Sequence, residues 1–172
     1  MIYTAAIKKD IEEIASDLGC GTGRIAAALA ILGIEEILCI DISCTDLEEA
    51  IRNVEELGLR NMVEPICWDI TRSAPRKLGL VMMNPPFGVH RRGADMAFLE
   101  SAMSASNKIY TIHKYNKKSL ELIKRKASER GFSVELIGIY SMEIPAMFET
   151  HRKKIHRFPI MMLRIYREQE NR

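Results

Sequence analysis

A four-residue segment, Asn84-Pro85-Pro86-Phe87, carries residue types suited to chemistry on an amino group attached to an aromatic ring. It follows an apolar run over residues 78–83, which has the composition of a buried strand. Prolines cannot donate ladder hydrogen bonds, so the strand ends there, and Pro86 keeps Pro85 extended. We expect the Asn84 side chain and nearby carbonyl oxygens to point outward, beside the Phe87 ring.

Such a group of acceptors suits the exocyclic amine of adenine, whose nitrogen lone pair is delocalised into the ring. Acceptors on both N–H groups would favour a pyramidal nitrogen and free the lone pair for methylation, while Phe87 could stack on the base. The alternative interpretation is a proline turn that only ends a strand. Because Asn-Pro-Pro-aromatic directly after a buried strand is uncommon, we favour function. The predicted catalytic residues are Asn84, Pro85, Pro86 and Phe87, and Asn84 is also predicted to contact the cofactor.

A second segment, Asp17-Leu18-Gly19-Cys20-Gly21-Thr22-Gly23, lies between an expected strand at 14–16 and an expected helix at 24–32. This is the layout of phosphate loops in nucleotide-binding α/β folds. The dinucleotide fingerprint G-x-G-x-x-G fails, because Arg24 occupies the third glycine position. The Asp17 carboxylate would repel a pyrophosphate but suits a cationic amine, such as that of S-adenosylmethionine. The alternative is a glycine-rich turn without a ligand. The predicted cofactor contacts are Asp17, Gly19, Gly21 and Gly23.

Two further aspartates follow later expected strands. Asp41 ends an expected strand at 37–41, and in Rossmann-like folds an acidic residue at this point binds ribose hydroxyls. Asp69 follows the apolar stretch 62–68, from where it could reach the adenine amine of the cofactor. Either residue taken alone could instead form a turn or cap a helix. Because they follow successive strands, we favour the ligand interpretation for Asp41 and leave both open for Asp69.

The composition describes an ordinary soluble globular chain of one domain, residues 1–172, with 47% hydrophobic and 28% charged residues. The longest apolar stretch, 25–34, is too short to span a bilayer, and no leader sequence begins the chain, so we expect a cytoplasmic protein without membrane contact. The four cysteines lack zinc-ligand spacing, so we expect reduced thiols, with neither a disulfide nor a metal. They are Cys20, Cys39, Cys44 and Cys67.

The charge is unevenly distributed along the chain. Residues 1–106 hold 10 basic and 16 acidic residues, whereas residues 107–172 hold 15 basic and 7 acidic residues. An acidic cofactor half and a basic second half suit a polyanionic substrate. Helix-borne lysines are most simply a solvated face, whereas two loop clusters are better candidates for phosphate contacts. The predicted contacts in these clusters are Arg91, Arg92, Lys153 and Lys154.

These residues require a sheet to position them. After a short helix in the first dozen residues, we expect five strands that alternate with helices, at 14–16, 37–41, 62–67, 80–83 and 108–113. The helices are expected at 24–32, from a Thr45 or Asp46 cap to Leu57, at 95–104 and at 117–130. Two final strands, 133–144 and 158–166, form an antiparallel hairpin. The alternation predicts a doubly wound α/β fold with ligands at the carboxyl ends of its strands.

Together these features resemble the class I S-adenosylmethionine-dependent methyltransferases, and specifically the METTL-type ribosomal RNA adenine-N6 methyltransferase family of archaea and eukaryotes. The resemblance extends from residue 14 onward. It is carried by Asp17-Leu18-Gly19-Cys20-Gly21-Thr22-Gly23, Asp41-Ile42, Met83-Asn84-Pro85-Pro86-Phe87-Gly88, Asp95-Met96-Ala97-Phe98-Leu99 and His113-Lys114. It implies a Rossmann-like, mostly parallel seven-stranded sheet and S-adenosyl-L-methionine as cofactor. It also implies methyl transfer to a single-stranded or loop adenine of small-subunit ribosomal RNA.

The same resemblance assigns roles to residues. Asp17, Gly19, Gly21, Asp41 and Ile42 would hold the cofactor, with Asp69 near its adenine, and residues 84–87 would hold the target base. His113 and Lys114 would border the substrate pocket. Without the resemblance, His113 alone would be interpreted as a strand-end histidine whose hydrogen bonds are satisfied. The family further implies a small zinc-ribbon activator protein, which could add a strand beside residues 62–67 at a sheet edge. One departure is the segment 1–13, which is shorter than the family's cofactor-covering amino-terminal segment.

Three rival functions remain open. A glutamine-N5 protein methyltransferase uses a similar Asn-Pro-Pro loop, but typically with Tyr where this chain has Phe87, and the basic second half favours RNA. DNA adenine methylation is weaker, because no separate target-recognition domain fits this length. The third rival is a cofactor-fold scaffold that binds RNA or a partner without turnover.

Overall fold

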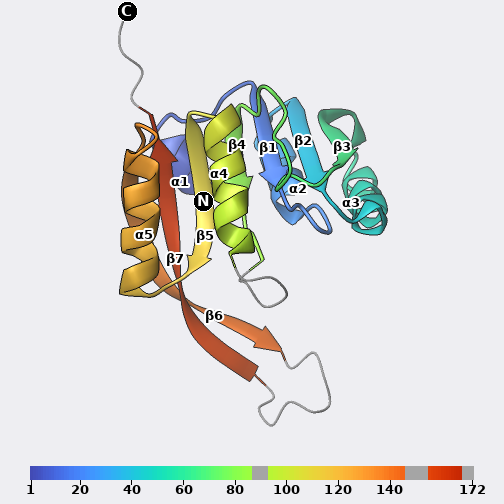
Figure 1. The fold of residues 1–172 in the computed structure, drawn as a ribbon. Helices are drawn as coiled ribbons and strands as arrows, with labels where there is room; N and C mark the ends of the chain where they lie inside the picture. The colour runs from blue at the N-terminus through green and yellow to red at the C-terminus, as the bar shows by residue number, and fades with distance from the viewer. Residues whose placement is uncertain (87–92, 146–154, 168–172) are drawn as a thin grey trace, which may run out of the picture.

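The computed structural model describes residues 1–86, 93–145 and 155–167, and these form one seven-stranded sheet with helices on both faces (Figure 1). The strands are β1 (Ile14–Leu18), β2 (Glu36–Asp41), β3 (Val63–Cys67), β4 (Leu80–Met83), β5 (Lys108–Lys114), β6 (Ser133–Pro145) and β7 (Ile155–Tyr166). The helices are α1 (Ile2–Ile7), α2 (Arg24–Ile31), α3 (Cys44–Glu56), α4 (Ala94–Ala105) and α5 (Lys117–Ser128), with a 3-10 turn at Arg60–Met62.

The strand order is β3-β2-β1-β4-β5-β7-β6. β1 to β5 run parallel to one another, while β7 runs antiparallel to both β5 and β6. The predicted doubly wound sheet with a terminal antiparallel hairpin is therefore confirmed. Because β1 and β4 lie side by side at the centre, the glycine-rich loop after β1 and the proline segment after β4 leave the same edge of the sheet.

Alternating strand residues build two cores. Ala15, Ile37 and Met82 belong to the core under α1, α2 and α3, whereas Leu18 and Val81 belong to the core under α4 and α5. Side chains alternate between the two faces of a strand, so consecutive residues of one strand belong to different cores. β4 is buried at every position, as expected for a central parallel strand covered on both sides.

The amino-terminal segment is part of this packing. Ala5 of α1 is fully buried, and Asp10 accepts hydrogen bonds from Tyr110 Oη (2.7 Å) and from Arg164 Nε (2.6 Å) and Nη2 (3.0 Å). Asp10 thereby ties the segment to β5 and β7. A bidentate guanidinium–carboxylate pair is among the strongest side-chain contacts, so residues 1–10 are fixed against the sheet.

The start of α3 differs from the prediction. Ser43 caps the helix, because its Oγ accepts a hydrogen bond from the Asp46 backbone N–H at 3.2 Å, so the predicted Thr45 or Asp46 cap was wrong. The physical reason is the turn before it, in which Asp41 Oδ1 accepts a hydrogen bond from the Ser43 N–H at 2.9 Å. That bond turns the chain as soon as β2 ends, and the helix starts early.

The prediction of four reduced cysteines was also wrong. Cys44 and Cys67 form a disulfide with their Cα atoms 5.3 Å apart, whereas Cys20 and Cys39 are buried free thiols. The pair is 23 residues apart in sequence, and only the β2–β3 pairing brings it together. Such pairing cannot be deduced from spacing alone. In the described part of the chain no cluster could hold a metal ion, and no helix there is both long and apolar enough to cross a membrane.

Candidate active site

The glycine-rich loop after β1 is tied to the end of β2. The backbone N–H groups of Gly19 and Cys20 donate to the Ile40 carbonyl (2.8 and 3.2 Å), and the Gly21 N–H donates to Asp41 Oδ2 at 2.9 Å. Asp41 therefore holds both the loop and, through its other oxygen, the turn into α3. The loop and the predicted ribose-binding carboxylate form one hydrogen-bonded unit.

Two loop glycines are required by close packing. Gly19 has φ +70°, and a Cβ there would lie 2.9 Å from the Phe98 ring of α4. Gly23 has φ +76°, and a Cβ there would lie 2.9 Å from Ala50 Cβ of α3. Only glycine adopts these angles without strain. A Cβ at Gly21, by contrast, would meet open space. Phe98 received no individual role from the sequence, because its contact with Gly19 is tertiary.

Asp17 is an unusual carboxyl group. It is 1% exposed, its Oδ2 accepts a hydrogen bond from the Ala26 N–H at 3.0 Å, and its Oδ1 has no partner among the described residues. Burial raises the pKa of Asp17 to about 7, the charge of Asp41 adds to this rise, and the Ala26 bond opposes it. A buried carboxyl oxygen without a partner, beside a glycine loop, fits a ligand with a cationic amine.

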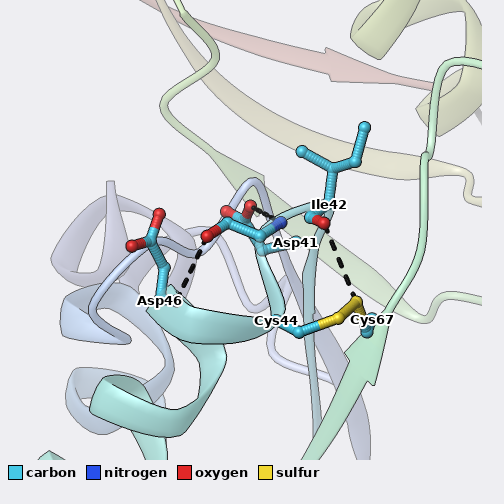
Figure 2. The surroundings of a disulfide bond; sticks show 6 residues. Asp41, Ile42, Cys44, Asp46 and Cys67 are labelled. Carbon is cyan, nitrogen blue, oxygen red and sulfur yellow. Dashed lines mark hydrogen bonds between the residues drawn. A yellow bond between two sulfur atoms is a disulfide. The ribbon is translucent and has the colours of Figure 1, made fainter.

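The next two predicted residues, Ile42 and Asp69, follow the ends of β2 and β3. Ile42, labelled in Figure 2, is 69% exposed, so its side chain is accessible to a ligand, and its cofactor contact stays a prediction. Asp69 forms a turn in which its Oδ1 accepts hydrogen bonds from Thr71 N–H (3.0 Å) and Thr71 Oγ1 (2.6 Å). The turn interpretation of Asp69 is thus present in the structure, and its cofactor contact stays a prediction. Trp68, which the sequence reasoning missed, directly follows β3 and is 48% exposed.

The proline segment begins at the end of β4, as predicted. Asn84 is exposed, Pro85 is buried and Pro86 is exposed, so the exposed asparagine precedes a buried proline that anchors the segment. Five of the predicted substrate contacts lie outside the described residues, and one of them, Phe87, is also a predicted catalytic residue. These are Phe87, Arg91, Arg92, Lys153 and Lys154.

His113, at the end of β5, is 1% exposed. Its Nε2 lies 3.0 Å from Thr111 Oγ1, and its Nδ1 lies 3.4 Å from Asp95 Oδ2 in the first turn of α4. The His113 contact holds the pKa of Asp95 below its ordinary value. The histidine therefore joins β5 to the helix that follows the proline segment. Lys114, the next residue, is exposed, and its Nζ lies 5.6 Å from the centre of the Phe158 ring.

These residues fit S-adenosylmethionine by their chemistry. Asp17 offers an anionic oxygen for the amine, Gly21 offers space for close backbone approach, and Asp41 offers carboxylate oxygens for hydroxyl groups. They lie at adjacent strand ends, which is where open α/β sheets bind ligands. The fold and this edge together define a class I S-adenosylmethionine-dependent methyltransferase.

Comparison with known proteins agrees with this class. The family model of the methyltransferase small domain matches residues 2–109, and the chain belongs to that family. The predicted cofactor, S-adenosylmethionine, is confirmed by this membership together with the fold.

Three relatives illustrate the similarity. The uncharacterised protein MJ0284 of Methanocaldococcus jannaschii is 32% identical over 93% of this chain and 76% of its own length. The zebrafish (Danio rerio) rRNA N(6)-adenosine-methyltransferase METTL5 is 34% identical over 83% of this chain and 70% of its own length. A crystal structure of a candidate RNA methyltransferase, PH1948 from Pyrococcus horikoshii, superposes with a TM-score of 0.87 at 30% identity, covering 98% of this chain and 81% of that one. The recognised family resemblance is thereby confirmed.

Proposed function

We propose that this methyltransferase modifies the N6 amine of an adenine in RNA, and that the RNA is small-subunit ribosomal RNA. The observation that carries the proposal is the Asn84-Pro85-Pro86 turn at the end of β4, directly beside the glycine loop of β1. The relative METTL5 of Danio rerio, named as an rRNA N(6)-adenosine-methyltransferase, supports the choice of atom and substrate.

The proposed roles of the residues follow from their positions. When bound, S-adenosylmethionine supplies an electrophilic methyl group, so the protein needs no covalent intermediate. Asn84 Oδ1 accepts one N–H of the adenine amine and a nearby backbone carbonyl accepts the other, which localises the nitrogen lone pair. By its residue type, Phe87 would stack on the base. The nitrogen would gain the methyl group as the carbon–sulfur bond of the sulfonium breaks and leaves a neutral thioether, and it would give up one proton to water. The protein contributes mainly alignment, which alone can supply a large rate enhancement.

The described surface beyond β5 supports an RNA substrate. Tyr140 and Ile160 are paired across β6 and β7, as are Met142 and Phe158, so Tyr140 and Phe158 lie on the same sheet face. They line an open depression of about 400 Å³ together with Arg157. Lys114 lies over the Phe158 ring. Aromatic rings and cations gathered in this way suit stacked bases and phosphates of a single strand.

This surface lies on the same side as the proposed reaction. Figure 1 shows β6 and β7 extending past the carboxyl end of β5, the end of the sheet from which the proline segment leaves. Tyr140 is 48% exposed there. We propose that nucleotides flanking the target adenine lie along this hairpin. An adenine in a loop or single strand suits the site, because flipping a paired base costs a few kcal/mol.

The test offers the protein three methyl acceptors side by side with labelled S-adenosylmethionine. These are unmodified small-subunit ribosomal RNA, a glutamine-containing peptide and a DNA oligonucleotide. We expect label in the RNA alone. Label in the peptide would support the glutamine-N5 rival, and label in DNA would support DNA methylation. If no acceptor is labelled although the cofactor binds, the scaffold interpretation replaces the proposal.

We further propose a small zinc-ribbon partner at β3. Among the described strands β3 is paired with β2 alone, and an open depression of about 500 Å³ beside it is lined by residues that include Ile51, Arg60 and Pro65. An exposed edge accepts a strand from a partner, although Pro65 offers no N–H for the ladder. We expect a zinc-ribbon partner to co-elute with the chain and to raise its activity. Separate elution and unchanged activity would contradict this.

A further inference from the structure

The disulfide lies at the carboxyl ends of the strands, among the residues that we propose to bind the cofactor. Cys44 is the first residue of α3 and follows Asp41 by three positions, and Cys67 is the last residue of β3 and precedes Asp69 by two positions. The bond therefore joins the loop that contains Asp41 and Ile42 to the loop that contains Trp68 and Asp69 (Figure 2). These two loops present the predicted ribose and adenine contacts.

Two other contacts also join these loops in the described part of the chain. The Trp68 N–H donates to the Asp41 carbonyl at 2.8 Å, one residue beyond the last β2–β3 register pair, Asp41 with Cys67. Cys67 Sγ lies 3.7 Å from the Ile42 carbonyl oxygen, which is a packing contact because a disulfide sulfur carries no hydrogen. Since β3 is an edge strand, its end is held from one side only.

We propose that the Cys44–Cys67 disulfide is a positioning element for the cofactor: it fixes the spacing of these two loops, and its reduction weakens S-adenosylmethionine binding. The inference rests on the cofactor assignment and deepens the proposed function. With the bond intact, the loops are ordered before the ligand arrives. Without it, the ligand must order them on binding, and that ordering costs affinity.

The pair is open to reduction. Both cysteine residues are exposed, so a dithiol reductant can reach them. The reductant is oxidised to its cyclic disulfide, and its two electrons and two protons convert the Cys44–Cys67 bond into two thiols. The two remaining cysteines are buried, and the Cys39 side chain together with burial raises the pKa of Cys20 far above its ordinary value. A thiol held protonated is a poor nucleophile, so Cys20 does not exchange with the pair.

Trp68 provides a readout that needs neither RNA nor activity. It is the only tryptophan of the chain and follows Cys67 directly. Its indole Nε1–H donates to the Ser73 carbonyl at 2.9 Å, which fixes the ring near the loop. We expect its fluorescence to change when the disulfide is reduced, and again when cofactor binds.

The experiment compares S-adenosylmethionine binding by calorimetry in oxidised protein, protein reduced with dithiothreitol, and the double variant Cys44→Ser/Cys67→Ser. We expect the Kd to rise about threefold to tenfold on reduction and in the double variant. Dithiothreitol should leave the double variant unchanged, which assigns the effect to this pair. The KM for RNA should be the same in oxidised and reduced protein.

Reduction of the protein is checked by thiol alkylation and mass spectrometry. If the Kd of the reduced protein then differs from that of the oxidised protein by less than about twofold, the proposal is overturned. The reduced protein carries the test even if the double variant does not fold. Failure of the proposed function looks different: oxidised and reduced protein would differ in cofactor binding, yet neither would methylate RNA.

Discussion

The cofactor side and the substrate side of the site, both at the carboxyl ends of the strands, are built differently. On the cofactor side, carboxylates near the carboxyl ends of β1, β2 and β3 already accept hydrogen bonds from backbone N–H groups: Asp17 from Ala26, Asp41 from Gly21 and Asp69 from Thr71. On the substrate side, β4 and the β6–β7 hairpin present exposed side chains, among them Asn84 and Tyr140. A small ligand of constant shape binds more tightly to a site whose backbone is already ordered, whereas a long polymer suits a surface of adaptable side chains.

This contrast predicts that changes on one side leave the other side intact. The largest effect is expected for Asn84→Ala, because an acceptor aligned with the reacting amine acts on the transition state. Methyl transfer to RNA should fall by about a hundredfold to a thousandfold, while the Kd for S-adenosylmethionine stays unchanged. The kcat is measured from the transfer of labelled methyl groups to RNA, and the Kd for S-adenosylmethionine is measured by calorimetry.

The matched control is Asn61→Ala, which removes an exposed asparagine next to β3 and should keep full activity without a partner protein present. If Asn84→Ala retains most of its rate, or loses cofactor binding in parallel, the two sides are not separable in the way described.

The next largest effect is expected on the cofactor side, for Asp41→Asn. The amide can accept from only one of the two backbone donors, Gly21 and Ser43, so both the glycine loop and the turn loosen. A hydrogen bond to a charged group contributes about 1.5–3 kcal/mol, so the Kd for cofactor should rise roughly tenfold to a hundredfold. At saturating cofactor, kcat should change little.

Asp46→Asn is the control for that prediction, because Asp46 is an exposed carboxylate in the first turn of the same helix. It should bind cofactor like the unaltered chain. An Asp46 effect equal to the Asp41 effect would mean that general electrostatics, and not the hydrogen-bonded loop, sets the affinity.

A third effect concerns pH and Asp17. Burial raises the pKa of this carboxyl from 3.8 to about 7, so the ionised form that attracts a cationic amine is populated only above that pH. Cofactor affinity should therefore rise by up to about tenfold between about pH 6 and pH 7.5. Calorimetry across this range measures it, and Asp17→Asn should bind weakly with a flat profile.

The same pKa shift has a consequence for stability. Between about pH 4 and pH 7 the folded protein holds a proton on Asp17 that the unfolded chain has lost, so the free energy of unfolding falls as pH rises through this window. Denaturant unfolding of Asp17→Asn should lack that fall. An identical pH dependence in both proteins would contradict the assignment of the shifted pKa.

The smallest effect is expected for Tyr140→Ala on the projecting hairpin. Stacking of one base on an aromatic ring contributes about 1–3 kcal/mol, and a flanking nucleotide on an open depression belongs at the low end. The KM for RNA should rise about fivefold while the Kd for cofactor stays constant. Tyr3→Ala is the control, since Tyr3 is a 78% exposed tyrosine of α1 and should leave both values unchanged.

The sequence predicted the parts of this site that depend on local pattern. Apolar runs followed by glycine, proline or aspartate identified the strand ends, and the positions of Asp17, Asp41 and Asn84 followed. The parts that it missed depend on neighbours distant in sequence. The Phe98 ring is packed against Gly19, and Cys44 reaches Cys67 through the pairing of β2 with β3. Periodicity contains no information on such contacts.

The prediction of the α3 cap was wrong for a different reason. The four consecutive residues from Ser43 to Asp46 have oxygen or sulfur side chains, and the Ser43 N–H bond to Asp41 decides among them. The Trp68 position carried a usable signal, because an aromatic residue directly before a predicted adenine-contacting aspartate is a candidate for the same pocket. Its exposure confirms that it is accessible there.

The most direct test of the account identifies the methylated atom. Small-subunit ribosomal RNA labelled by this protein would be digested to nucleosides and compared with synthetic N6-methyladenosine, 1-methyladenosine and 2-methyladenosine by liquid chromatography and mass spectrometry. We expect label in N6-methyladenosine alone, and we expect no label when Asn84→Ala protein is used. Label at a ring carbon or ring nitrogen of adenine, or in another nucleoside, would contradict the proposed role of the Asn84-Pro85-Pro86 turn.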